Sequence, residues 1–186
     1  QHAHEFDLAL ADLDAVLSLQ PTNAQAWLTR ASIYQVQGRY EDARRACQPL
    51  LRLAGRHVAL TCLGDIAGLS GQAITSRETL TASLERPGIS VRERLWILTV
   101  LAEMAARTGD ASAAEKHFFD ARSLGVKDHY LIGAYADFLL DQGRTQEVVT
   151  LLQHETRADG LLLRLTLAEQ ALHLPVSKNH TAELAA

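Results

Sequence analysis

The sequence predicts an all-α solenoid of antiparallel helical hairpins. Four glycines, Gly38, Gly71, Gly109 and Gly143, follow one another at intervals of 33, 38 and 34 residues. Each stands between two segments whose apolar residues recur at helical spacing, where a helix must end and the chain must turn. A hairpin of two amphipathic helices cannot bury its apolar stripes alone, so we expect successive hairpins to stack.

The first complete unit illustrates the periodicity. Trp27, Ala31 and Tyr34 stand at i, i+4 and i+7, which places them on one helix face. Tyr40 and Ala43 begin a second stripe after the glycine turn. The chain is 47% hydrophobic but only 5% aromatic, so leucine and alanine, both good helix formers, must fill most of the core.

These units resemble the tetratricopeptide repeat (TPR), whose pattern has small and aromatic residues at fixed places around a turn glycine. The matching residues of the four units are Trp27, Ala31, Tyr34, Gly38, Tyr40 and Ala43; Leu60, Leu63, Gly64, Ala67 and Gly71; Leu98, Ala102, Ala105, Gly109, Ala114, Phe118 and Ala121; and Ile132, Tyr135, Ala136, Leu139, Gly143 and Val148. The resemblance implies a right-handed superhelix of about four full repeats, with partial repeats at both ends.

The expected boundaries follow from that resemblance. They are 6–21 for the second helix of a partial repeat, 24–55 for a repeat, 58–86 for a divergent repeat, 91–125 and 129–156 for two more repeats, 159–174 for an additional helix, and 175–186 for a tail or linker. No polar capping helix is evident at either end. We therefore expect part of a longer protein, or ends that neighbouring molecules cover.

Local signals support several of these boundaries. Ser90 and Glu93 form a capping-box pattern, and Asp110 and Asp128 stand where N-caps are expected. Pro49 departs from the family pattern, because it lies inside an expected helix and should kink or shorten it.

Two cysteines, Cys47 and Cys62, have neither a CxxC nor a metal-ligand spacing. Our first interpretation is that both are small buried hydrophobic side chains. A disulfide between adjacent helices is the alternative.

The sequence gives little support to other classes of function. A net charge of -4 without a basic stripe argues against nucleic-acid binding, and no apolar run is long enough for membrane insertion. Phosphate-binding loops, zinc motifs and nucleophile elbows are missing. We therefore expect no catalytic residues, no metal site and no cofactor.

In TPR proteins the first helix of each hairpin lines a concave groove. Carrying the groove positions over gives a candidate peptide-binding face of Gln25, Leu28, Ser32, Gln35, Thr61, Asp65, Leu69, Trp96, Thr99, Glu103, Arg107, Tyr130, Ala134, Asp137 and Asp141. TPRs that hold a carboxylate tail use Lys, Arg and Asn at these places. This set contains only Arg107 of those types, which argues against that ligand.

Four acids, Asp65, Glu103, Asp137 and Asp141, make the expected groove mildly acidic around apolar patches. This favours a protein or peptide partner with some basic character. The alternative is a solvated helix face that keeps the solenoid soluble. Trp96 is either a binding anchor or a packing residue between repeats.

The leading hypothesis is therefore a non-catalytic scaffold or adaptor. The alternative is a structural module that self-associates or docks onto the rest of a larger protein. The chain has 15 arginines and 3 lysines, a bias typical of GC-rich bacterial genomes. It suggests a bacterial protein, with a lean towards the periplasm or envelope.

Overall fold

The computed structural model describes residues 2–153 and 159–174. All regular secondary structure in these two ranges is helical. The helices are α1 (His2–Leu19), α2 (Ala24–Val36), α3 (Tyr40–Cys47), α4 (Leu50–Leu53), α5 (Arg56–Leu69), α6 (Ala73–Leu84), α7 (Val91–Arg107), α8 (Ala111–Arg122), α9 (His129–Asp141), α10 (Thr145–Leu152) and α11 (Asp159–Ala171). The expected tail at 175–186 lies outside the described residues.

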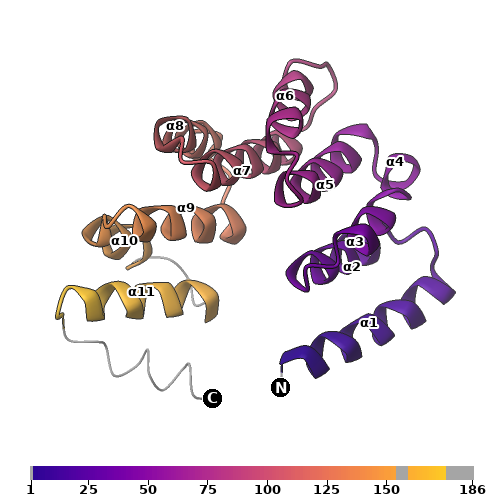
Figure 1. Cartoon of the computed structure of the whole chain (residues 1–186), viewed down its shortest axis with the longest axis horizontal. Helices are drawn as coiled ribbons and strands as arrows, with labels where there is room; N and C mark the ends of the chain where they lie inside the picture. Colours follow the sequence, from indigo (N-terminus) through magenta and orange to yellow (C-terminus); the bar gives the residue numbers. More distant parts are fainter. Residues whose placement is uncertain (1, 154–158, 175–186) are drawn as a thin grey trace.

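The helices pair into consecutive antiparallel hairpins, α2 with α3, α5 with α6, α7 with α8, and α9 with α10. Helices α2, α5, α7, α9 and α11, which we call the inner helices, also contact one another in succession. Among the described residues, the outer helices α3, α6, α8 and α10 do not contact one another. Because only the inner helices contact one another from hairpin to hairpin, the stack curves towards the side on which they lie. Figure 1 shows the resulting arch, with α1 and α11 at its two ends.

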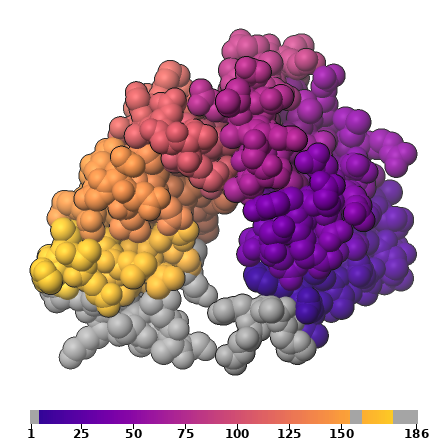
Figure 2. Space-filling model, in the orientation of Figure 1, coloured from indigo at the N-terminus to yellow at the C-terminus, as the bar shows by residue number. Residues whose placement is uncertain are grey.

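The arch encloses a hollow. Figure 2 shows this hollow between the violet N-terminal hairpin and the orange C-terminal helices. The predicted all-α solenoid of stacked hairpins is therefore confirmed, and its inner side is a surface that a partner could enter.

The turns use the expected residues. Gly38, Gly71, Gly109 and Gly143 all have positive φ angles between 68° and 92°, a conformation that ends a helix at little cost only when the residue lacks a side chain. The predicted capping box is present, because the Ser90 hydroxyl accepts from the Glu93 amide while the Glu93 carboxylate accepts from the Ser90 amide.

Pro49 interrupts the second helix of the first hairpin, as predicted. Helix α3 ends at Cys47 and the short α4 begins at Leu50, because proline cannot donate the backbone hydrogen bond that a continuous helix needs. Asp110 and Asp128 also cap α8 and α9 as expected, each accepting from a backbone amide three residues further on.

The largest core cluster lies in the C-terminal half and is built around Phe118. This side chain is fully buried and packs against the rings of Tyr135 and Phe138, with centroid separations of 5.2 and 5.5 Å. Alanines at small positions of α7 and α8 let the helices approach closely around it. The aromatic contacts connect the third hairpin to the fourth.

The interpretation of the cysteines as two separate thiols is wrong, because Cys47 and Cys62 form a disulfide. Both residues are buried, as expected, but the repeat stacking brings α3 against α5 with the two Cα atoms 5.9 Å apart. That separation is within the range of disulfides. The bond ties the first hairpin to the second.

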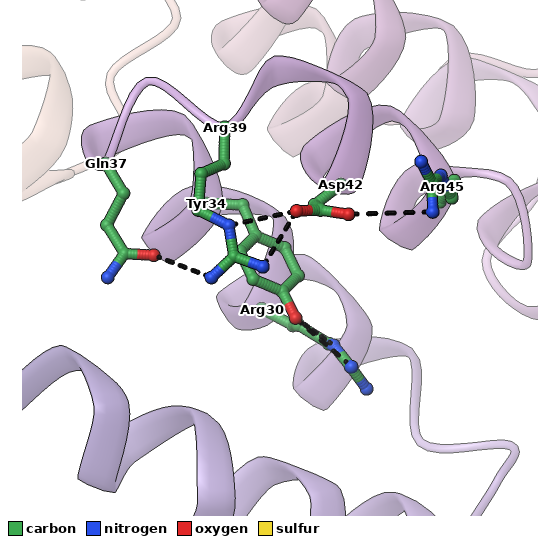
Figure 3. A network of polar contacts seen from close by, with 6 residues as sticks. All are labelled: Arg30, Tyr34, Gln37, Arg39, Asp42 and Arg45. Atoms are coloured by element: carbon green, nitrogen blue, oxygen red, sulfur yellow. Dashed lines mark hydrogen bonds and ion pairs between the residues drawn. The ribbon is translucent and has the colours of Figure 1, made fainter.

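An arginine network holds α1 against the first hairpin. Arg30 pairs with Asp14 of α1 at 2.7 Å and donates to the Tyr34 hydroxyl. The Arg39 guanidinium lies 4.4 Å from the centre of the Tyr34 ring and also pairs with Asp42. Figure 3 shows how Tyr34 lies between the two arginines. Arginine stacks well on aromatic faces, so this network orders the N-terminal end of the arch.

Candidate functional site on the inner face

One hollow on the inner face is a pocket of about 380 Å³, which we call the apolar pocket. Its lining comes from four inner helices: Leu28, Ala31, Ser32, Gln35 and Val36 of α2, Cys62 and Asp65 of α5, Trp96 of α7 and Tyr130 of α9. Only the curvature of the arch can bring α2 and α9 to the same hollow. Val36 is 70% exposed and Tyr130 is 47% exposed, so the rim offers apolar surface to solvent.

Asp65 forms the polar floor of this pocket. It is only 7% exposed. Gln35 donates to one carboxylate oxygen at 2.8 Å, and Arg107 approaches the other at 3.7 Å. Burial raises the pKa of Asp65, while these two partners act in the opposite direction. The side chains therefore connect α2, α5 and α7 across the groove.

Glu103 and Tyr130 make the next connection, from α7 to α9. The Tyr130 hydroxyl donates to the Glu103 carboxylate. Burial raises the pKa of Glu103 to about 7, and the negative charges of Asp65 and Asp137 push the same way. The Tyr130 hydrogen bond opposes this rise. Glu103 thus divides between its charged and neutral forms at neutral pH.

A second, smaller hollow of about 140 Å³ adjoins this pair, and we call it the acidic pocket. Its lining is Glu103, Ala106 and Arg107 of α7, Phe118 of α8, and Ala134, Asp137, Phe138 and Asp141 of α9. Arg164 of α11 makes a two-pronged contact with Asp137 at 2.5 and 2.6 Å. No ion pair involves Asp141 anywhere in the described ranges.

The structure brings most of the sequence-predicted groove residues to these two pockets. Those lining the apolar pocket are Leu28, Ser32, Gln35, Asp65, Trp96 and Tyr130. Those lining the acidic pocket are Glu103, Arg107, Ala134, Asp137 and Asp141. Trp96 also packs against two core clusters, which confirms the packing role that the sequence left open. Its role as a binding anchor stays a prediction.

Four predicted residues lie elsewhere. Thr61 and Thr99 have no exposed surface, and each hydroxyl donates to the backbone carbonyl four residues earlier in its own helix. A partner cannot reach them without rearrangement, so we leave both out of the proposed binding face. Gln25 is exposed and Leu69 is half-buried, and neither lines the two pockets.

Arg164 is the inner-face residue that sequence reasoning missed. The register of α11 could not be fixed from its continuous apolar run. Arg164 is nevertheless the only charged residue between Leu161 and Ala168, and a lone cation in such a run is expected to meet a carboxylate on the neighbouring element. Its pairing with Asp137 removes part of the negative charge that the sequence predicted for the groove.

The described residues contain neither a metal-ligand cluster nor a membrane-spanning helix. No group of three or more His, Cys, Asp or Glu side chains within them could hold a metal ion. Nor does any helix of residues 2–153 or 159–174 have the length and apolar character needed to cross a membrane. The inner face combines the apolar pocket with two hydrogen-bonded polar pairs, Gln35–Asp65 and Tyr130–Glu103. This arrangement is suited to binding.

Comparison with known proteins agrees with this geometry. A tetratricopeptide-repeat family model matches residues 2–59, and the stacked hairpins continue through the rest of the described chain. Residues 2–59 therefore carry tetratricopeptide repeats, and the described chain has a TPR-like fold. The sequence matches no curated protein.

Several solved structures share the TPR fold of this chain. PilW, described as a widely conserved type IV pilus biogenesis factor, is 17% identical with a TM-score of 0.61, over 99% of this chain and 85% of its own. A tetratricopeptide-repeat protein from Parabacteroides merdae ATCC 43184 is 20% identical with a TM-score of 0.61, over 98% and 71%. PilF of Pseudomonas aeruginosa is 13% identical with a TM-score of 0.53, over 99% and 82%.

These identities establish a common fold and no more. TPR arrays generally serve as protein–protein interaction modules and are typically non-catalytic. The partner depends on the groove side chains of the individual protein, since a fold of this kind hosts many functions.

Proposed function

We propose that this protein is a non-catalytic scaffold that binds a peptide or an extended protein segment along its inner face. The apolar pocket is the observation that carries the proposal. It is assembled from four inner helices and keeps Val36 and Tyr130 substantially exposed. A preformed groove with apolar walls and a few convergent polar groups is the usual form of a peptide site.

The polar side chains of the groove support binding over catalysis. Asp65 and Glu103, which have raised pKa values, are already held by Gln35 and Tyr130 from neighbouring helices. They cross-link the inner helices, since Asp65 connects α5 to α2 and Glu103 connects α7 to α9. Raised pKa values of this kind follow from burial in a structural network.

A matched pair of variants tests the proposal. Ser32→Arg places a large side chain over the apolar pocket, from an exposed hydroxyl that bonds only to the carbonyl of Leu28. Thr79→Arg makes a similar change on the outer helix α6, at an exposed hydroxyl bonded to the carbonyl of Thr75. Peptides are selected from a random dodecapeptide display library on the wild-type chain, and their affinities are measured by fluorescence anisotropy.

We expect Ser32→Arg to weaken binding of the selected peptides by about tenfold or more, because groove contacts dominate the binding energy. Thr79→Arg should leave it within about twofold, as expected of a surface change outside a hot spot. Equal binding to the wild type and Ser32→Arg, or no peptide enrichment at all, would refute the inner face as the site.

Self-association is the second candidate, and exposed apolar side chains at the two ends of the arch favour it. Leu8 and Leu19 of α1 are 55% and 83% exposed, and Leu163 and Leu167 of α11 are 50% and 48% exposed. Stacking α11 of one molecule on α1 of the next would bury both sets. Sedimentation velocity over a wide concentration range tests this: a mass that rises with concentration in the wild type and not in Leu163→Glu supports it, and a constant monomer mass excludes it.

The disulfide bears on where the protein works. A bond between Cys47 and Cys62 persists in an oxidising compartment and is rare in a reducing cytosol. We therefore extend the proposal to a protein that acts in an oxidising setting such as a bacterial periplasm. Thiol labelling of the protein taken directly from its source cells tests this, because a labelled, reduced pair in the native location would contradict it.

A further inference from the structure

The apolar and acidic pockets are neighbours, separated by two side-chain contacts. Tyr130 lines the apolar pocket and donates to Glu103, which lines the acidic pocket. Asp65 lines the apolar pocket and pairs with Arg107, which lines the acidic pocket. The two hollows therefore form one continuous binding surface with an apolar section and a charged section.

The charged section has an excess of negative charge. Glu103, Asp137 and Asp141 line it together with one cation, Arg107. Arg107 already faces Asp65, and Asp137 is matched by Arg164 from outside the pocket. Asp141 is exposed and has no ion-pair partner among the described residues. A cation that enters this pocket would give Asp141 a partner.

The walls of the acidic pocket suit a long basic side chain. Ala106, Ala134 and Phe138 provide apolar surface next to the carboxylates. Lysine and arginine side chains bury their aliphatic stems on such surface while the charged head meets an acid. An acidic side chain in the same place would face uncompensated like charge.

Building on the proposed function, we infer that the groove recognises a bipartite peptide motif, in which a bulky apolar side chain fills the apolar pocket and a nearby arginine or lysine enters the acidic pocket. The aromatic walls Trp96 and Tyr130 provide the anchor site. Asp141 and Glu103, which line the acidic pocket, provide the charge selection. This motif is more specific than a generally basic partner, because it requires both residues at a fixed separation.

Proton release on peptide binding provides an independent signature. Glu103 faces Asp65 of α5, Arg107 on its own helix, and Tyr130 and Asp137 of α9, and its pKa lies at about 7. A bound cation favours the ionised carboxylate, so binding of a basic peptide should release a proton from the neutral form. The affinity for a basic peptide should therefore increase as the pH rises from 6 to 8.

Synthetic peptides test the inference on the full chain. Each probe is a Gly/Ser dodecapeptide with one Phe and one Arg, separated by a spacing that varies across the set. Matched probes carry Glu in place of Arg, or Ser in place of Phe. Affinities are measured for the wild type, for Asp141→Lys in the acidic pocket, and for Glu78→Lys, an equivalent charge reversal at an exposed site on α6.

We expect one spacing to bind best, and both replacements to weaken it by about tenfold or more, as for hot-spot contacts. Asp141→Lys should remove or reverse the preference for Arg over Glu, while Glu78→Lys keeps it. Probes that bind equally with Arg or Glu, yet lose affinity with Ser32→Arg, would overturn the inference and leave the proposed function intact. Failure of every probe, when library-selected peptides do bind the groove, would also overturn it. If Ser32→Arg leaves the affinity for the library-selected peptides unchanged, the proposed function itself is refuted.

Discussion

Replacing Glu103 by glutamine should change how the stability of the protein depends on pH. The pKa of Glu103 is about 7 in the folded chain against an ordinary value of 4.5. Because the folded pKa is raised, the contribution of this carboxyl to stability is fully present below pH 4.5. It is lost as the pH rises through 7, where folding must keep a desolvated charge. Glutamine stays neutral and can still accept from the Tyr130 hydroxyl.

The magnitude follows from the same two pKa values. Each pH unit between them corresponds to about 1.4 kcal/mol, so the full interval amounts to about 3 kcal/mol as a ceiling. Urea unfolding at several pH values from 4.5 to 8 gives the free energy of unfolding for wild type and Glu103→Gln. The variant should match the wild type at pH 4.5 and become progressively more stable than it, by about 1–3 kcal/mol at pH 8.

Tyr130→Phe serves as the control for this account. It removes the hydrogen bond that lowers the pKa of Glu103 but keeps a ring that excludes water. The pH range over which the free energy of unfolding falls should therefore extend to higher pH in Tyr130→Phe than in the wild type. A stability difference between wild type and Glu103→Gln that does not vary with pH would refute the reasoning, because Glu103 would then titrate like an ordinary surface acid.

Three further predictions concern the scaffold, and each is measured by urea unfolding. Reducing the disulfide, which closes a loop with a sequence separation of 15, should cost about 3 kcal/mol, while a variant with both cysteines changed to alanine should not respond to reductant. Gly64→Ala would place a Cβ 3.1 Å from the buried Leu80 side chain and should destabilise the protein by up to about 2 kcal/mol. At Gly133 the nearest atoms to a Cβ lie at 3.6 Å, so Gly133→Ala should stabilise the protein by up to about 1 kcal/mol. The same sign for both variants would contradict the packing argument. Phe118→Ala should lower the free energy of unfolding by about 3–5 kcal/mol, and the same change at its exposed neighbour Phe119 by less than about 0.5 kcal/mol. Similar losses at the two positions would mean that the aromatic cluster is not the core of the third hairpin.

The fold was predictable because its signals are local and repeated. The glycine turns, the Ser90 capping box and the break at Pro49 each depend on residues within one or two turns of the chain. Repetition then makes the stacking predictable, since every hairpin has the same unsatisfied apolar stripe.

The site was predictable in outline only. Family positions identified the inner face, but Thr61 and Thr99 turned out to be buried because an inner helix also packs against its neighbours. The disulfide and the Arg164–Asp137 pair depend on side chains from different hairpins meeting. Such contacts follow from the three-dimensional stacking, which the spacing of residues along one helix does not specify.

The most direct test of peptide binding on the inner face is an NMR titration. The isotope-labelled protein is titrated with the best-spaced Phe–Arg dodecapeptide, and amide shifts are mapped onto the helices of Figure 1. The account predicts that the largest shifts fall on α2, α5, α7 and α9, around Ser32, Asp65, Trp96 and Asp141. Shifts concentrated on the outer helices α6, α8 and α10, or on the ends α1 and α11, would contradict it.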